Sequence, residues 1–365
     1  MSHHHEKHNG QPRYMPTMTS DYSRTSDTAR AVNSVIHPRM EAYLQSIAPQ
    51  VAAMGANQPF VIADYGTNDG VSSSPLIAAI VNQLHEINSP LKVNLAYADI
   101  VGRGPFDQFW PKSHLAQMPG VSAIFIDRSY YELYPEIAGE LNLGYSSTSV
   151  HWLNTKNAVS GFWQHPVNIQ PNQLTGAERH KFVEKWKKDW TTFLLHRWDE
   201  LVPGGVLFMS NLADLDGRDQ WPASAGYNYI RDICNEMCAE KTITPQELNN
   251  IFVPDYFALP DEFQAVLASP EVKRRYRVEY FEPMTIPCPY YHKYEGKLDD
   301  PAARQELGLT LAHEVRSWSR SSVITGLSDE HKDKIDEIYR RLEDKFCRNP
   351  KALPFQYCMM ELRKI

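Results

Sequence analysis

Apolar residues along this chain follow two alternating patterns. Short apolar runs, such as FVIADYG at 60–66 and VSAIFID at 121–127, predict strands, and the first of them, which ends on a glycine, predicts a buried strand of a parallel sheet. Between these runs the apolar positions recur every three or four residues, which predicts amphipathic helices. The predicted strands cover 60–66, 91–100, 121–127, 140–147, 203–211, 275–284 and 355–364, and the predicted helices cover 26–54, 73–87, 177–201 and 324–346. We expect Pro38 to kink or split the first helix.

Strands that alternate with helices predict an α/β fold with a mostly parallel sheet. After Asn211 the pattern changes, and residues 213–270 predict helices and loops without a strong strand. We expect this segment to cover the carboxyl ends of the strands, where open α/β sheets bind ligands. The predicted organisation is therefore a disordered tail at 1–20, a core at 21–212 and 271–365, and a helical cap at 213–270.

The composition and charge of the chain bear on which kinds of partner it could bind. The 365 residues carry a net charge of −7, with 37 basic and 44 acidic side chains, so the basic footprint of a nucleic-acid-binding protein is not evident. No apolar window approaches the roughly 18 residues of a membrane span, and the polar N-terminus does not resemble a secretory signal. We therefore expect neither a nucleic-acid nor a membrane partner.

Cysteine and histidine positions predict neither disulfides nor a metal site. The five cysteines are odd in number and scattered through the second half of the chain, which favours free thiols in a reducing cytoplasm. His3, His4 and His5 have no cysteine or acidic partner at ligand spacing, so a disordered tail is the preferred interpretation of the N-terminus.

The loop after the first strand carries the main chemical signal. It reads Asp64-Tyr-Gly66-Thr-Asn68-Asp-Gly70, so the G-x-G-x-x-G fingerprint of dinucleotide sites is incomplete, and no P-loop occurs in the chain. A ligand with a ribose and a charged amino-acid end but no phosphate fits better, and S-adenosylmethionine is such a ligand. Gly66 allows a close approach, Asp99 at the end of the second strand can accept hydrogen bonds from the ribose diol, and Asp64 can pair with the ammonium. Each aspartate alone could equally be a helix N-cap or a loop charge.

Several segments together resemble the SABATH family of methyltransferases, which transfer the methyl group of S-adenosylmethionine to small-molecule carboxylates and in some members to nitrogen. The family elements D-L-G-C-S-S-G-P-N-T, N-D-L, G-S-F-Y…R-L-F-P, S-S-Y-S-L-x-W-L-S, V-P-G-G and I-P-x-Y-x-P-S-x-x-E are similar to residues 64–73, 98–100, 129–135, 146–154, 202–205 and 286–295, in that order. The block at 146–154 (SSTSVHWLN) is the most specific match. The resemblance spans 22–365 and implies a Rossmann-like class I methyltransferase sheet and a homodimer.

The resemblance also implies roles for individual residues. Trp152 would donate its indole N–H to the substrate carboxylate, with His151 and Thr148 as further positioning residues. The family pattern Y-x-x-N-S-x-x-Q differs here, because Ala29 stands where a glutamine assists carboxylate binding. His151, if it faces the pocket, indicates an aromatic acid with an additional acid or hydroxyl group, or a dicarboxylate. The expected cofactor contacts are Tyr22, Ser26, Asp64, Gly66, Asn68, Asp99, Ile100, Ser129, Tyr130 and Ser147.

The preferred function is therefore S-adenosylmethionine-dependent O-methylation of a carboxylic acid. A carboxylic acid with a pKa of about 4 is already ionised at neutral pH, so the transfer needs no general base. Three alternatives remain open at this point: N-methylation of an azaheterocycle, a partner protein that holds the cofactor without turnover, and a dehydrogenase.

Overall fold

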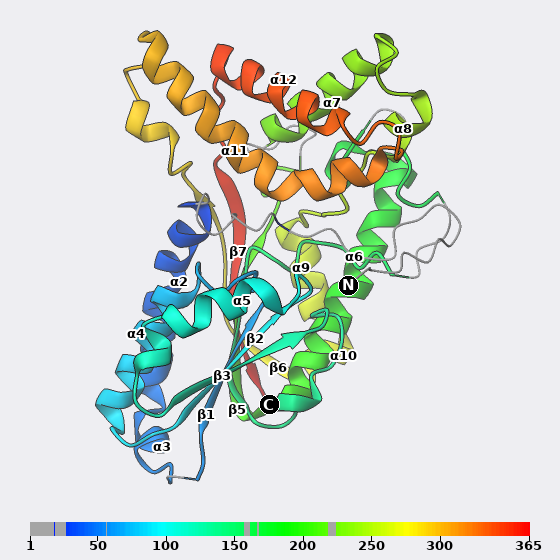
Figure 1. Cartoon of the computed structure of the whole chain (residues 1–365). Coiled ribbons are helices and arrows are strands. Elements are labelled where there is room, and N and C mark those ends of the chain that lie inside the picture. The colour runs from blue at the N-terminus through cyan, green and yellow to red at the C-terminus, as the bar shows by residue number, and fades with distance from the viewer. Residues whose placement is uncertain (1–17, 19–26, 56, 157–160, 166–167, 218–223) are drawn as a thin grey trace.

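This computed structural model describes residues 18, 27–55, 57–156, 161–165, 168–217 and 224–365 (Figure 1). Its centre is a seven-stranded sheet with the order β3-β2-β1-β4-β5-β7-β6. The first five strands in the chain are parallel to one another, and β7 is antiparallel to both β5 and β6. The predicted α/β class with a mostly parallel sheet is confirmed. The strands are β1 (Phe60–Tyr65), β2 (Val93–Asp99), β3 (Val121–Asp127), β4 (Leu141–Ser147), β5 (Leu201–Leu212), β6 (Tyr276–Ile286) and β7 (Phe355–Lys364).

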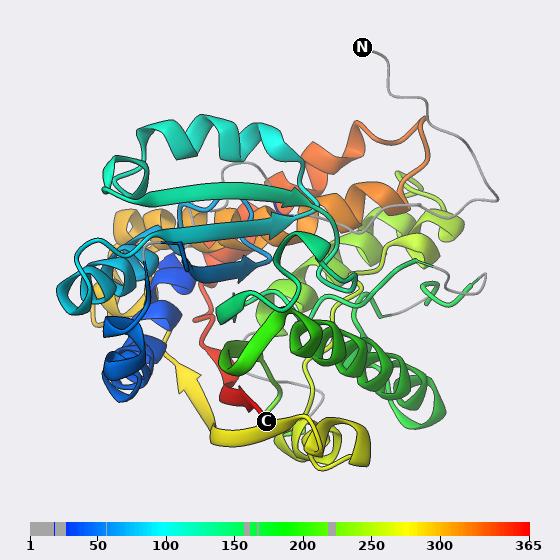
Figure 2. The ribbon, with the colours of Figure 1, turned by 90° about the horizontal axis from the view of Figure 1, so that it is seen from below.

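Helices cover both faces of the sheet and gather at one end of it. Figure 2 shows α2 and α6 on opposite sides of the sheet, and α4 packs beside α2. The helices are α2 (Asp27–Ser46), α3 (Ala48–Ala52), α4 (Ser74–Ile87), α5 (Arg103–Phe109), α6 (Gly176–Glu200), α7 (Ala225–Ala239), α8 (Pro245–Asn250), α9 (Pro260–Leu267), α10 (Pro270–Lys273), α11 (Pro301–Gly326) and α12 (Lys334–Arg348). Short 3₁₀ turns are η1 (Trp110–Lys112), η2 (Leu115–Gln117), η3 (Pro135–Ile137), η4 (Pro171–Gln173) and η6 (Tyr291–Tyr294).

Four helices gather at the end of the sheet where β7 begins. Figure 1 shows α7, α8, α11 and α12 there, and Tyr357 of β7 pairs with Leu212 at the carboxyl end of β5. The cap predicted at 213–270 stays a prediction. In this structure α11 and α12, which belong to the predicted core segment, lie next to α7 and α8 of the predicted cap. The predicted tail at 1–20 lies outside the described residues except for Met18.

Two helix predictions were wrong in detail. The first helix continues through Pro38 and breaks at Ile47 instead, between α2 and α3. The helix predicted at 324–346 is in fact the end of α11 and a separate α12 that begins at Lys334. The turn between them is held by Glu247 of α8, whose carboxylate accepts hydrogen bonds from the backbone N–H and hydroxyl of Ser328. A distant side chain therefore fixes a break that the local pattern did not reveal.

In the described part of the chain, no helix has both the length and the apolar character needed to cross a membrane.

Candidate functional site

A cavity lies at the carboxyl ends of β1, β2 and β4, and its empty space, including the part that is open to solvent, is about 850 Å³. The strand order reverses between β1 and β4, and in open α/β sheets ligands usually bind in the crevice at such a reversal. All of the predicted cofactor residues that the structure describes meet here. The lining consists of Met18, Ala29, Asn33, Asp64, Gly66, Thr67, Asn68, Ser72, Ser73, Asp99, Ile100, Val101, Ser129, Tyr130, Tyr145, Ser147, Thr148, Ser149 and Trp152. Tyr22 and Ser26 lie outside the described residues, so their predicted role stays a prediction.

The loop after β1 turns tightly beneath this cavity. Gly66 has a φ of 78° and Asn68 a φ of 55°, a region that side-chain-bearing residues rarely adopt. A Cβ atom at Gly66 would lie 2.4 Å from Cβ of Ser149, whose hydroxyl donates to the carbonyl of Tyr65 at 3.0 Å. Glycine is therefore required at position 66 by both conformation and space.

We expect Gly66→Ala to destabilise the fold more than Gly102→Ala. Both glycines have a positive φ, but an added Cβ at Gly102 would meet nothing within 4 Å. Gly102 has a φ of 83° and a ψ of 163°, a conformation that only glycine adopts readily, so Gly102→Ala should cost about 1–3 kcal/mol of backbone strain. At Gly66 the clash with Ser149 should add about 1 kcal/mol to a similar strain. Chemical denaturation of the two variants measures the difference, and equal losses would mean that Ser149 moves away freely.

The Asp99 carboxylate accepts hydrogen bonds from the backbone of two neighbouring loops and also lines the cavity. Its Oδ2 accepts from the backbone N–H of Asn68 at 2.7 Å, and its Oδ1 accepts from Ile100 at 2.7 Å and Val101 at 3.1 Å. Burial raises the pKa of Asp99, while these three hydrogen bonds oppose the increase. A carboxylate has about four lone-pair directions, so about one remains for a ligand hydroxyl. The two interpretations of this aspartate, loop anchor and ligand acceptor, are therefore compatible.

Asp64 is a buried carboxyl group at the end of β1. Only 4% of its surface is exposed, and its Oδ2 accepts from the hydroxyl of Ser73 at 2.5 Å. Burial raises its pKa to about 6. The carboxyl group is therefore mostly ionised at pH 7, and a cationic group in the cavity would stabilise its charge.

A second, smaller cavity adjoins the first, and its empty space, including the part that is open to solvent, is about 360 Å³. Its lining is largely aromatic and includes His151, which is buried and whose pKa is lowered to about 3 by that burial. His151 therefore faces a cavity and is neutral at physiological pH. The lining consists of Met18, Thr28, Thr148, His151, Trp152, Leu212, Tyr227, Asp255, Phe257, Glu314, Trp318 and Phe355.

Thr148 and Trp152 line both cavities, as does Met18. Thr148 has a φ of 53°, and its hydroxyl lies 3.1 Å from that of Tyr357 on β7. Trp152 pairs with Asp255 in an isolated antiparallel bridge. The structure thus places the predicted positioning residues at the junction of a larger and a smaller cavity.

The sequence analysis missed the residues that the later half of the chain adds, above all Asp255. A signal was present, because the quoted pattern I-P-x-Y-x-P-S-x-x-E has tyrosine two residues after its proline. At 286–295 Pro289 stands in that place, whereas the segment VPDYFALPDE at 253–262 has Tyr256 there and ends on Glu262. Asp255 is the variable residue of this second match and lines the smaller cavity.

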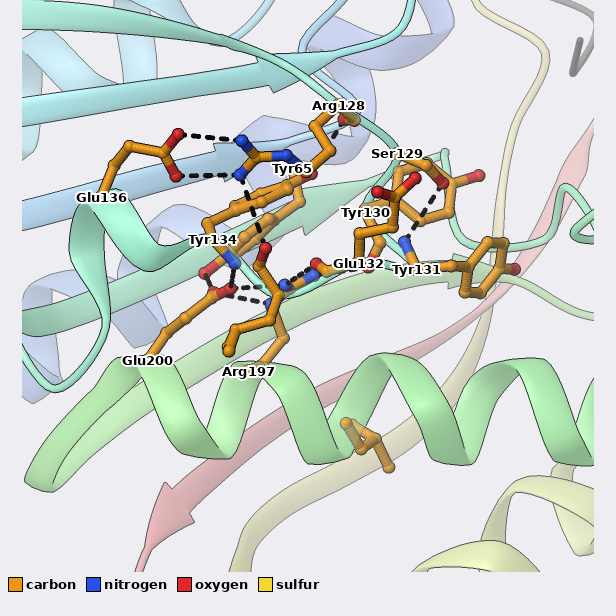
Figure 3. Close-up of polar contacts among 12 residues, drawn as sticks. Tyr65, Arg128, Ser129, Tyr130, Tyr131, Glu132, Tyr134, Glu136, Arg197 and Glu200 are labelled. Carbon is orange, nitrogen blue, oxygen red and sulfur yellow. Dashed lines mark hydrogen bonds and ion pairs between the residues drawn. The ribbon is translucent and has the colours of Figure 1, made fainter.

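A buried ion pair supports the wall that Ser129 and Tyr130 provide (Figure 3). Arg197 and Glu200 of α6 have no exposed side-chain surface and are joined at 2.5 Å. The Arg197 guanidinium also donates to the carbonyl of Tyr130 at 2.6 Å and to that of Glu132 at 2.8 Å. These hydrogen bonds hold the segment after β3 against α6 and so shape the larger cavity.

Comparisons with known proteins agree with this geometry. A family model described as SAM dependent carboxyl methyltransferase matches residues 17–364. A probable S-adenosylmethionine-dependent methyltransferase of Arabidopsis thaliana is 23% identical over 329 residues, which cover 84% of this chain and 85% of that protein. Anthranilate O-methyltransferase 3 of Zea mays is 22% identical over 263 residues, 68% of this chain and 63% of that protein. A solved structure of loganic acid methyltransferase with SAH superposes with a TM-score of 0.71 at 16% identity, covering 96% of this chain and 98% of that one.

Proposed function

Since this chain belongs to the family of S-adenosylmethionine-dependent carboxyl methyltransferases, we propose that its larger cavity holds S-adenosylmethionine and its smaller cavity the acid. The chain is an enzyme that methylates a carboxylic acid with S-adenosylmethionine as cofactor. The observation that carries the assignment of the cavities is their junction at Thr148 and Trp152. A methyl donor in one cavity and an acceptor in the other can meet only there.

The larger cavity suits the parts of this cofactor. Asp64 is a buried carboxyl group that would hold the ammonium, and Asp99 has about one lone-pair direction left for a ribose hydroxyl. Gly66 and Asn68 shape the loop beneath, while Ile100, Ser129, Tyr130 and Ser147 complete the walls. The bound cofactor supplies an electrophilic methyl group on a sulfonium centre.

The protein's own contribution is to position the acid and to exclude water. The acid is already an anion, so no residue needs to remove a proton. Trp152 can donate one N–H and has no acceptor that would compete for the methyl group. His151 is neutral and Thr148 is fixed by its contact with Tyr357, so both act by shape and hydrogen bonding. Positioning of this kind can lower a barrier by roughly 7–11 kcal/mol in favourable cases.

The product tests this function directly. The protein is incubated with methyl-labelled S-adenosylmethionine and panels of aromatic, fatty and terpenoid acids and azaheterocycles, and the extract is then treated with mild alkali. We expect label that is extractable and then released by alkali, because methyl esters hydrolyse there. Label that survives alkali would identify nitrogen as the acceptor, and cofactor binding without turnover of any compound would favour a partner protein.

Asp64 predicts a pH dependence of cofactor affinity. Protonation of Asp64 below its pKa of about 6 removes the charge that would pair with the ammonium, so affinity should fall as the pH drops from 7 to 5. Affinity should also fall above about pH 8, where an α-amino group loses its proton. Calorimetric titration across this range checks both limbs. Asp64→Asn should remove the acid limb, whereas Asp127→Asn, at an exposed aspartate that ends β3, should keep it.

We also propose that the enzyme acts in the cytoplasm as a homodimer. The five free cysteines, three of them buried, suit a reducing compartment, and the family resemblance supports the dimer. Light scattering of the purified chain tests the oligomeric state.

A further inference from the structure

The smaller cavity contains a buried carboxyl oxygen without a partner. Asp255 is 1% exposed; its Oδ2 accepts a hydrogen bond from the hydroxyl of Tyr227, but its Oδ1 has no partner among the described residues. The nearby amide nitrogen of Gln170 is already engaged, because it donates to the backbone carbonyl of Asp255 at 3.3 Å and to Asn172 at 3.0 Å. A buried acceptor without a donor is costly and calls for an explanation.

The charges around this oxygen exclude one kind of ligand. Asp255 and Glu314 are both acidic, His151 is neutral, and no lysine or arginine occurs among the described residues that line the cavity. A second carboxylate on the substrate would therefore meet like charge or neutral groups without a compensating cation. The structure thus argues against the dicarboxylate that the sequence left open.

The shape of the cavity favours a flat ring. Aromatic surface comes from Tyr227, Phe257, Trp318 and Phe355, and the ring centroids of Tyr227 and Trp318 lie 4.6 Å apart. The backbone bridge between Trp152 and Asp255 holds these two residues side by side. Residues paired directly in this way have Cβ atoms about 4.5–5.5 Å apart, so one compact acid can contact both.

We propose that Asp255 determines which acid is methylated, by accepting a hydrogen bond from a donor group on the ring of an aromatic monocarboxylic acid. The inference rests on the proposed function, in which the carboxylate of that acid lies at Trp152. The donor is a hydroxyl or an amino group. Nδ1 of His151 and Nε1 of Trp318 are likewise buried without a partner among the described residues. A hydroxyl group, which donates and accepts, can satisfy more of this lining than a bare ring can.

Matched acids test the proposal on the intact enzyme. The panel is benzoic acid, its ring-hydroxy, ring-amino and aminomethyl isomers, and the benzenedicarboxylic acids, each measured as kcat/KM for alkali-labile methyl ester. We expect at least one donor-bearing isomer to exceed benzoic acid by about tenfold or more, and every dicarboxylic acid to fall below it. A preference for the cationic aminomethyl isomers would identify a charge pair, and a preference for hydroxy or amino isomers a neutral hydrogen bond.

Substitutions of Asp255 test whether this residue causes the preference for a donor-bearing acid. Asp255→Leu should bring the ratio between the best isomer and benzoic acid close to one while benzoic acid is still methylated. Asp255→Asn, which keeps the shape, should lower the ratio by about threefold or more and covers the case in which the leucine variant does not fold. Asp214→Asn is the matched control, because Asp214 is equally buried but lines neither cavity, and its ratio should not change.

Three results would overturn the inference while leaving the proposed function intact. They are equal rates for benzoic acid and all its donor-bearing isomers, an unchanged ratio in both Asp255 variants, and esters formed only from aliphatic or dicarboxylic acids. Failure to form an ester from any acid would instead overturn the proposed function, and this inference with it.

Discussion

Replacing Asp99 with alanine should weaken S-adenosylmethionine binding by about 100-fold or more. The substitution removes the charge-assisted hydrogen bond that we propose between Asp99 and the ligand, and such a bond is worth about 1.5–3 kcal/mol. It also leaves the backbone N–H groups of Asn68, Ile100 and Val101 without their acceptor, so the loop that shapes the cavity loses its anchor. A total of about 3 kcal/mol corresponds to a factor of about 100 in the dissociation constant.

The neighbouring strand offers a matched control for this variant. Asp127 ends β3 directly beside Asp99 in the parallel register, but it is exposed and does not line the cavity. Asp127→Ala should leave the dissociation constant within about twofold. Calorimetric titration of both variants gives the comparison, and denaturation without ligand shows whether Asp99→Ala remains folded. Similar dissociation constants for the two variants would show that Asp99 does not contact the cofactor.

Arg197→Met should lower the free energy of unfolding by about 3–5 kcal/mol, the usual cost of breaking a fully buried ion pair. The guanidinium is wholly buried, and although burial lowers its pKa, the Glu200 carboxylate and neighbouring tyrosines outweigh this effect and raise the pKa. Methionine would leave Glu200 charged in the interior and the carbonyls of Tyr130 and Glu132 without donors. Because Ser129 and Tyr130 line the larger cavity, in which we propose that the cofactor binds, cofactor affinity should fall together with stability.

A second substitution separates the ion pair from the hydrogen bonds that surround it. Replacing Glu200 by leucine as well removes the unpaired charge, and in a simple ion pair this restores much of the stability. Here the Glu200 carboxylate also accepts from the hydroxyl of Tyr65 at 2.6 Å and the backbone N–H of Tyr134 at 2.8 Å, so we expect little recovery. Full recovery in the double variant would mean that the segment after β3 holds its shape without α6.

The exposed Arg340 provides the control for the arginine substitution. It pairs with Glu337 and Asp344 on α12, but 58% of its side chain is open to solvent. Arg340→Met should have little or no effect on unfolding, since exposed ion pairs contribute little. A loss as large as that of Arg197→Met would show that burial is not the cause.

The strands were predictable from the sequence because each is a short segment rich in apolar residues between helical patterns. The observed β1 and β3 agree with the strands predicted at 60–66 and 121–127 to within a residue. β1 is buried along its whole length, whereas β3 lies at the edge of the sheet and exposes Ser122, Ile124 and Asp127. The connection of late strands to the same sheet also followed from the pattern, although their antiparallel pairing with β5 did not.

Helix α11 was missed because its environment is not visible in its own sequence. Buried serines and Glu314 interrupt its apolar positions, and Gly308 and Gly326 allow the backbones of α12 and the segment at Ile251 to come close. A helix covered on several sides by other helices shows no clean apolar stripe. Only the assembled fold shows why these polar and small residues are compatible with burial.

The lining of the larger cavity was far more predictable from the sequence than that of the smaller cavity. Asp64, Gly66 and Asp99 follow directly from the ends of β1 and β2, and the parallel sheet brings such ends together. Asp255 lies between regular elements, where neither periodicity nor charge marks it. Its position depends on the bridge to Trp152, a contact across about a hundred residues of chain.

The two cavities also divide the chain between two tasks. Every described residue that lines the larger cavity lies at or before Trp152, whereas Leu212, Tyr227, Asp255, Phe257, Glu314, Trp318 and Phe355 belong to the smaller one. If the larger cavity binds the cofactor and the smaller one the acid, as we propose, substitutions after Trp152 can change which acid is accepted without changing the residues that line the cofactor cavity. Such a layout lets a lineage explore new substrates without repeatedly losing its chemistry.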